Sequence, residues 1–126
     1  MDKQKSILLA LLKLNHMNEI DTRDRLHKLI YLAQKGGVEG DPIETKIQDF
    51  NFTNTTDPFS PEFETVLDET ISDGLIEEKS DGYKITEKGL NLYKTDGLKQ
   101  LSIHEIETLN VIKSLYNYPV NISKVN

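Results

Sequence analysis

Apolar residues recur at intervals of three and four along most of this chain, the spacing that places side chains on one face of an α-helix. In the first such stretch, Ile7, Leu8, Leu11 and Leu12 share one face. The pattern predicts five helices, at about residues 2–14, 21–35, 60–73, 86–94 and 102–117. A mostly helical protein is therefore expected.

The ends of these helices are marked by residues with strong capping preferences. Short polar side chains that can accept hydrogen bonds from first-turn amides precede four of them: Asp21 or Thr22, Ser60, Thr86 and Ser102. Pro61 suits the first position of its helix, and Glu105 completes a capping box with Ser102. The Gly36-Gly37 pair and Gly74 predict left-handed helix ends.

Three short stretches alternate apolar and polar residues, as strands with one buried face do. Residues 75–79 and 83–85 are separated by Ser80-Asp81-Gly82, in which Gly82 can take a positive φ. They predict a β-hairpin. Residues 46–52 predict a further, half-buried strand.

The order helix, helix, strand, helix, hairpin, helix is the outline of a winged helix-turn-helix, although periodicity alone permits other small α+β folds. We expect an α+β, mostly helical fold, with a winged helix-turn-helix domain at residues 1–95 and an extra C-terminal helix and frayed tail at residues 96–126. That last helix either packs on the domain or forms a dimer. Its apolar stripe for dimerisation consists of Ile103, Ile106, Leu109, Ile112 and Leu115.

Five short motifs carry a resemblance to a known family. They are Leu26-His27-Lys28-Leu29-Ile30-Tyr31, Phe50-Asn51-Phe52, Asp57-Pro58-Phe59-Ser60-Pro61-Glu62-Phe63, Gly74-Leu75-Ile76, and Tyr83-Lys84-Ile85-Thr86 with Gly89. Over roughly residues 5–93 the chain resembles bacterial and archaeal winged helix-turn-helix proteins related to the Panacea antitoxin domain. The resemblance implies that fold and a role as a regulator or antitoxin. Asp57 stands where the family favours glycine, so the turn before Pro58 is expected to differ.

Composition adds constraints on location and chemistry. The chain has 126 residues, 37% hydrophobic and 29% charged, and no apolar run approaches the roughly 18 residues of a membrane span. The apolar stretch after Lys5 contains Lys13 and leads to no small-residue cleavage site, which argues against a secretory signal. There is no cysteine, so disulfides and thiolate metal sites are excluded. We expect a cytoplasmic protein with no membrane partner.

The net charge of −6 is concentrated in the middle of the chain. Residues 1–35 carry seven basic and four acidic side chains, residues 36–80 carry two and twelve, and residues 81–126 carry six and five. An acidic middle repels nucleic-acid phosphate and favours a basic protein partner or simple solubility.

The first functional hypothesis is a DNA-binding transcriptional regulator whose second helix and hairpin contact the DNA backbone. A homodimer formed through the last helix would suit this role. The candidate DNA-binding residues are Arg23, Arg25, Lys28, Lys79, Lys84 and Lys88. The third helix has no lysine or arginine, which makes it a poor reader of the major groove. The competing interpretation is that these cations form a solvated surface that offsets the acidic middle.

The alternative is a protein-interaction module of antitoxin or accessory-subunit type, whose acidic third helix binds a basic protein partner. Its candidate partner-binding residues are Glu62, Glu64, Asp68 and Glu69. A purely solubilising role of these carboxylates is the competing interpretation.

No catalytic, metal-binding or cofactor-binding set of residues is predicted. His16, His27 and His104 are far apart in the chain, with no carboxylate at metal-ligand spacing. Glu77 and Glu78 would point to opposite faces of a strand and cannot act as a pair. The sequence therefore predicts a binding module rather than an enzyme.

Overall fold

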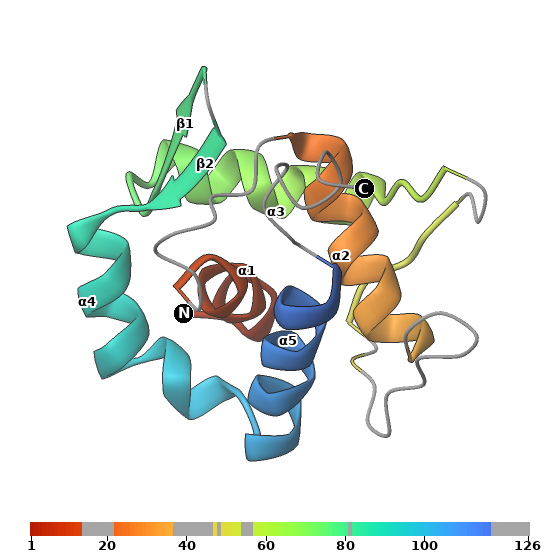
Figure 1. The fold of residues 1–126 in the computed structure, drawn as a ribbon. Coiled ribbons are helices and arrows are strands. Elements are labelled where there is room, and N and C mark those ends of the chain that lie inside the picture. Colours follow the sequence, from red (N-terminus) through yellow and green to blue (C-terminus); the bar gives the residue numbers. More distant parts are fainter. Residues whose placement is uncertain (14–21, 37–46, 48, 54–56, 81, 117–126) are drawn as a thin grey trace, which may run out of the picture.

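The structure, a computed structural model, describes residues 1–13, 22–36, 47, 49–53, 57–80 and 82–116. This part of the chain forms an α+β, mostly helical fold, as the sequence predicts (Figure 1). In chain order the elements are α1 (Lys3–Lys13), α2 (Arg23–Lys35), α3 (Pro61–Ser72), β1 (Ile76–Lys79), β2 (Gly82–Ile85), α4 (Glu87–Thr95), the short 3-10 helix η1 (Gly97–Gln100) and α5 (Ile103–Tyr116).

Helix α1 lies at the centre of the fold, and the other elements surround it (Figure 1). Every residue from Ser6 to Leu12 is buried, so this stretch of α1 has no face toward water. The helices α3, α4 and α5, the strand β2 and η1 all contact it. The core is therefore built around one helix that is apolar on almost every side.

The helix starts that the sequence predicts are confirmed by their capping hydrogen bonds. The side chains of Thr22, Ser60 and Thr86 accept from backbone amides in the first turns of α2, α3 and α4. Ser102 and Glu105 form the expected capping box, with reciprocal hydrogen bonds of 3.1 and 2.8 Å. Local sequence thus fixes where these helices begin.

Glycines end two helices and shape the hairpin, again as predicted. Gly36 and Gly74 follow α2 and α3 with φ of 91° and 76°, a region that favours glycine. The strands β1 and β2 pair antiparallel, with Ile76 opposite Ile85 and Glu77 opposite Lys84. Expected features at Leu14, Asp21, Gly37, Asp81 and the tail from Val120 lie outside the described residues.

The strand expected over residues 46–52 is not confirmed. Lys46 and Gln48 lie outside the described residues, and residues 49–52 belong to no strand. The side chain of Gln34 takes the place of a neighbouring strand, since it donates to the carbonyl of Phe50 at 2.7 Å and accepts from the amide of Phe50 at 2.7 Å. Ile47 and Phe50 are still buried, so the apolar half of the pattern was informative.

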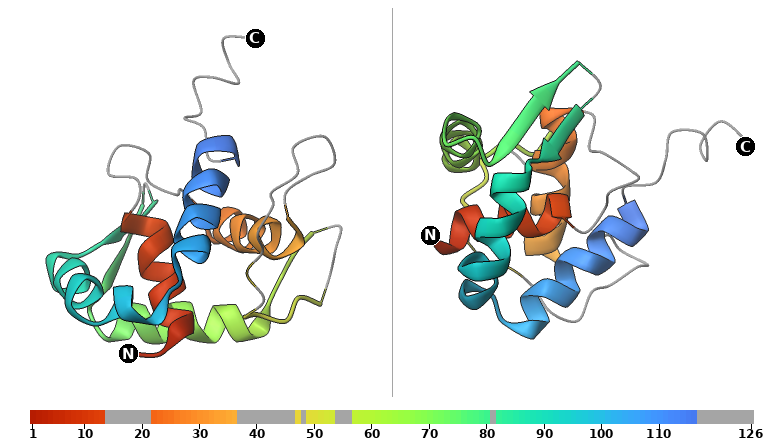
Figure 2. Two further views of the ribbon diagram at one scale, coloured as in Figure 1. Left: turned by 90° about the horizontal axis from the view of Figure 1, so that it is seen from below. Right: turned by 90° about the vertical axis from the view of Figure 1, so that its left-hand side faces the viewer.

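Helix α5 folds back and lies beside α1 and α2 (Figures 1 and 2). Leu109 and Ile112 are fully buried, and Ile106 packs against the same core. The prediction that Leu109 and Ile112 serve dimerisation is wrong, because both side chains are covered by their own chain. Ile103 is 71% exposed, and Leu115 is half-buried.

Gly89 in α4 lies against the backbone that leads into the hairpin. A Cβ atom at this position would stand 2.1 Å from the carbonyl oxygen of Leu75, which already accepts a hydrogen bond from the amide of Thr86. The contact is with backbone, so a flexible side chain cannot move away to make room.

We therefore expect Gly89→Ala to lower the free energy of unfolding by about 1–3 kcal/mol, as overpacking does, despite the better helix propensity of alanine. Urea unfolding followed by circular dichroism measures this. Asn91→Ala, at an exposed position of α4, is the control and should change the value by less than about 0.5 kcal/mol. Equal stability of the two variants would contradict the close packing at Gly89.

Candidate functional site

Arg23, in the first turn of α2, lies between three carboxylates from two other elements. Its Nη1 is 2.8 Å from Glu64 Oε2, its Nη2 is 2.9 Å from Asp68 Oδ1, and its Nε is 3.5 Å from Glu78 Oε2. Glu64 and Asp68 are one turn apart on α3, and Glu78 is on β1. One guanidinium therefore joins α2, α3 and the hairpin, using the fork geometry that lysine lacks.

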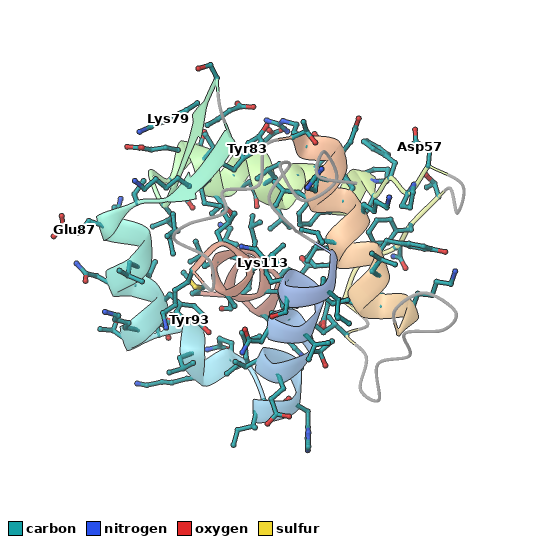
Figure 3. All side chains as sticks on the ribbon, in the orientation of Figure 1. Asp57, Lys79, Tyr83, Glu87, Tyr93 and Lys113 are labelled. Carbon is teal, nitrogen blue, oxygen red and sulfur yellow. The ribbon has the colours of Figure 1, made fainter. Side chains whose placement is uncertain are left out.

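Tyr83 of β2, labelled in Figure 3, completes this arginine cluster, which we define as Arg23, Glu64, Asp68, Glu78 and Tyr83. The guanidinium carbon is 5.9 Å from the centre of the Tyr83 ring, and the phenol donates a hydrogen bond to Glu78 Oε2. Burial and the hydrogen bond to Glu78 raise the pKa of Tyr83 to about 12. The same hydrogen bond, assisted by Arg23, lowers the pKa of Glu78.

Arg23 remains firmly charged in this setting. Burial lowers the pKa of its guanidinium, but the hydrogen bond to Asp68 and the surrounding negative charges outweigh that effect and raise it. The arginine cluster thus holds one partly buried cation, each of whose three nitrogen atoms lies within 3.5 Å of a carboxylate of the same chain.

His27, one turn after Arg23 on α2, is 1% exposed and uses both ring nitrogens within the chain. Its Nδ1 accepts a hydrogen bond from the backbone amide of Ser60 at 3.1 Å, and its Nε2 lies 2.7 Å from Glu64 Oε1. A backbone amide can only donate, so Nδ1 carries a lone pair and Nε2 carries the proton. The ring is therefore neutral and donates to Glu64.

Aromatic rings surround His27. Phe59 stacks on the imidazole with centroids 4.7 Å apart, and Phe63 meets it edge-on at 4.9 Å. Phe52 lies 6.4 Å from His27 and 5.3 Å from Tyr31. Phe59 is 43% exposed, so it covers the histidine while keeping one face toward solvent. This packing anchors the segment before α3 onto α2.

The arrangement offers little for catalysis. Neither nitrogen of His27 is open to a substrate, because Ser60 and Glu64 occupy both. Among the described residues, no group of three or more histidines, aspartates or glutamates is placed to hold a metal ion. None of the described helices combines the length and apolar character that crossing a bilayer requires.

The six predicted DNA-binding residues lie on four elements and are largely engaged within the chain. Arg23 belongs to the arginine cluster, and Arg25 also interacts within the chain. Lys79 Nζ, near the tip of the hairpin in Figure 3, is 3.3 Å from Glu77, and Lys88 Nζ donates to the carbonyl of Asp73 at 2.9 Å. Lys28 and Lys84, which are exposed as Lys79 and Lys88 also are, come from α2 and β2, and Lys84 stands opposite Glu77 in the strand register.

The four predicted partner-binding carboxylates all lie on α3 but differ in environment. Glu64 is half-buried in the arginine cluster, and Asp68 is exposed but bound to Arg23. Glu62 is exposed and accepts a weak hydrogen bond from the amide of Asn51 at 3.2 Å. Glu69 is exposed, 3.9 Å from Lys5, whose amine is also 3.2 Å from Asp73.

The arginine cluster and the hydrogen bonds of His27 are not predicted by the hydrophobic and charge pattern of the chain. The two basic residues, Arg23 and His27, are four positions apart, as are Glu64 and Asp68, so each pair shares one face of its helix. That spacing was a usable signal for two facing helices. The match between the two faces depends on packing across about 40 residues of chain, which periodicity cannot supply.

Comparison of the chain with family models, with curated proteins and with solved structures finds no match.

Replacing the cation of the arginine cluster should destabilise the protein at neutral pH. In Arg23→Gln three carboxylates remain close together without their partner, and we expect the free energy of unfolding to fall by about 1–3 kcal/mol. Lys84→Gln, which removes an exposed positive charge from the same region, is the control and should have little effect.

The same pair of variants tests the pH dependence. Because the folded chain lowers the pKa of Glu78, its contribution is present above the ordinary value near 4.5 and is lost as pH falls through the lowered value. The difference between wild type and Arg23→Gln in urea unfolding should therefore shrink between about pH 7 and about pH 3. A constant difference would contradict the ion pairing.

The protonation of His27 can be observed directly. In a long-range nitrogen–proton correlation spectrum at neutral pH, Nδ1 of His27 should be the unprotonated nitrogen and Nε2 the protonated one. The exposed His104 provides an internal comparison. A proton on Nδ1 would be incompatible with the hydrogen bond from Ser60.

Proposed function

We propose that this chain is a protein-interaction module of winged-helix type, and that the exposed acidic face of α3 binds a basic protein partner. The order of its elements supports the winged-helix interpretation: three helices precede a hairpin, and further helices follow. Within the described residues, the sheet has only the two hairpin strands, so the strand that commonly precedes the third helix is not part of it.

The charge of α3 is the observation that carries the proposal. Five carboxylates and no basic side chain lie between Pro61 and Asp73. The cations that pair with them in the described structure are Arg23 and Lys5, which leaves a net charge of −3 on residues 61–73. Glu62, Asp68 and Glu69 are exposed, so the helix presents negative charge along its solvent side. Such a surface attracts a positively charged partner.

Groove insertion by α3 finds no support in this arrangement. DNA affinity depends strongly on cations that neutralise phosphates, and the helix in question has none. Arg23, the most strongly oriented of the predicted DNA-binding residues, has its guanidinium directed at three carboxylates of the same chain. Lys79 and Lys84 each lie beside Glu77. We therefore favour protein binding over DNA binding.

Charge reversal at exposed positions tests this function. Glu62→Lys combined with Glu69→Lys should strongly reduce the capture of basic proteins from a lysate of the native cells, and added salt should weaken the wild-type capture. Both positions lie outside the buried network around His27, so the fold should survive.

The matched control is Glu87→Lys combined with Glu107→Lys. Glu87 is in the first turn of α4 as Glu62 is in that of α3, and Glu107 is exposed on a helix as Glu69 is. The control should retain capture despite the same change in net charge. Equal loss in both double variants would show a general charge effect. Salt-dependent binding of duplex DNA, weakened by Lys79→Glu with Lys84→Glu, would instead favour the regulator hypothesis.

A further inference from the structure

Lys113, near the C-terminal end of α5, is a buried cation with no hydrogen-bond or ion-pair partner among the described residues. It is 5% exposed, and its Nζ atom is buried and makes no hydrogen bond. Its side chain lies where α5 meets α1 (Figure 3), one turn after the fully buried Leu109 and next to Ile112. Burial lowers the pKa of Lys113 to about 8. An amine in this position normally pairs with a carboxylate or reaches solvent.

The helices packed against α5 cannot compensate this charge. Within the bounds of α1 and α2 there are seven basic side chains and one carboxylate, Asp24, which is exposed in the first turn of α2. His27 donates to Glu64, and Tyr31 packs against Phe52. The basic side chains of these two helices are Lys3, Lys5, Lys13, Arg23, Arg25, Lys28 and Lys35. Neither of these two helices therefore offers a buried carboxylate to an ammonium between them.

The first turn of α5 is held very differently. Glu105 accepts from the backbone of Ser102 and forms an ion pair of 2.6 Å with Lys3 of α1. Further along α5 the other acidic residue, Glu107, is exposed, and His104 is exposed as well. An ion pair thus holds the start of α5 in place, whereas the buried charge of Lys113 destabilises the packing of its last turns.

We propose that the C-terminal half of α5 is a flap that opens from its far end, with Ser102 and Glu105 as the fixed end and the unpaired ammonium of Lys113 as the cause. Leu109 and Ile112 hold the flap closed by burying apolar surface against α1 and α2. Opening lets the amine reach water and uncovers the apolar surface beneath. This end of α5 lies on the side of the molecule away from α3 (Figure 2), so the flap is separate from the acidic surface proposed above.

The closed state should depend on pH in a defined direction. The pKa of Lys113 is about 8 in the closed structure and near its ordinary value of 10.5 once the amine is in water. The penalty on the closed flap is therefore full below about pH 8 and declines as pH rises from there toward 10.5. Local opening should become rarer over the same range.

Hydrogen exchange of backbone amides tests the flap. The variant is Lys113→Met, which keeps a long, unbranched side chain but removes the charge. In the wild type at pH 7, amides in the last two turns of α5 should exchange through local opening, faster than those of α1. In Lys113→Met the opening constant of α5 should fall by on the order of 10- to 100-fold, given the tenfold change per pKa unit.

Lys94→Met is the matched control, because Lys94 is also the basic residue in the last turn of its helix but is exposed. It should leave α5 unchanged. Protection of α5 equal to that of α1 in the wild type, or an opening constant that Lys113→Met does not alter, would overturn the proposal. Should Lys113→Met fail to fold, the wild type decides: its opening constant, corrected for intrinsic exchange, must fall between about pH 7 and about pH 9.5, and a constant value overturns the flap.

Discussion

The fold depends on the complete burial of residues 6–12 of α1. Seven consecutive residues of this helix are removed from water, so it has no side on which solvent can replace a neighbouring element. A helix of this kind is stable in water only if other elements cover it all round. This requirement explains why α3, α4, α5 and β2, although far apart in sequence, all contact it. It also explains why α5 contributes its apolar face to its own chain.

The partly buried Arg23 and the buried Lys113 meet the cost of desolvation in opposite ways. Arg23 lies among three carboxylates and an aromatic ring, and its charge becomes part of the joint between α2, α3 and the hairpin. Within the described part of the chain Lys113 has no such partner, and it relies on the apolar contacts of its helix to remain buried. Partnered charge gives a specific and rigid junction, whereas unpartnered charge lowers the local stability of the helix that carries it.

The same joint determines which surface is offered to other molecules. By engaging Glu64 and part of Asp68, Arg23 fixes one edge of α3 against α2, and the remaining carboxylates face outward. His27 and the rings around it hold the segment that leads into α3. The hydroxyl of Ser60 caps the helix by accepting from the amide of Phe63, and the amide of Ser60 donates to His27. The orientation of α3 thus follows from polar contacts at its start, and its negative face is a consequence of that orientation.

Local sequence determined the elements themselves. Capping residues such as Ser60 and Ser102, the glycines at 36 and 74, and the spacing of apolar residues act over a few positions, and the helices and hairpin occur where those signals lie. The sequence also placed the acidic residues on α3. Tertiary structure alone decided that Gln34 takes the place of a strand partner, that Arg23 faces Glu64 and Asp68, and that Leu109 and Lys113 turn inward. Each of these outcomes depends on which residues meet across tens of intervening positions. Hydrophobic periodicity predicts which face of a helix is buried, but it does not predict which other element will cover that face.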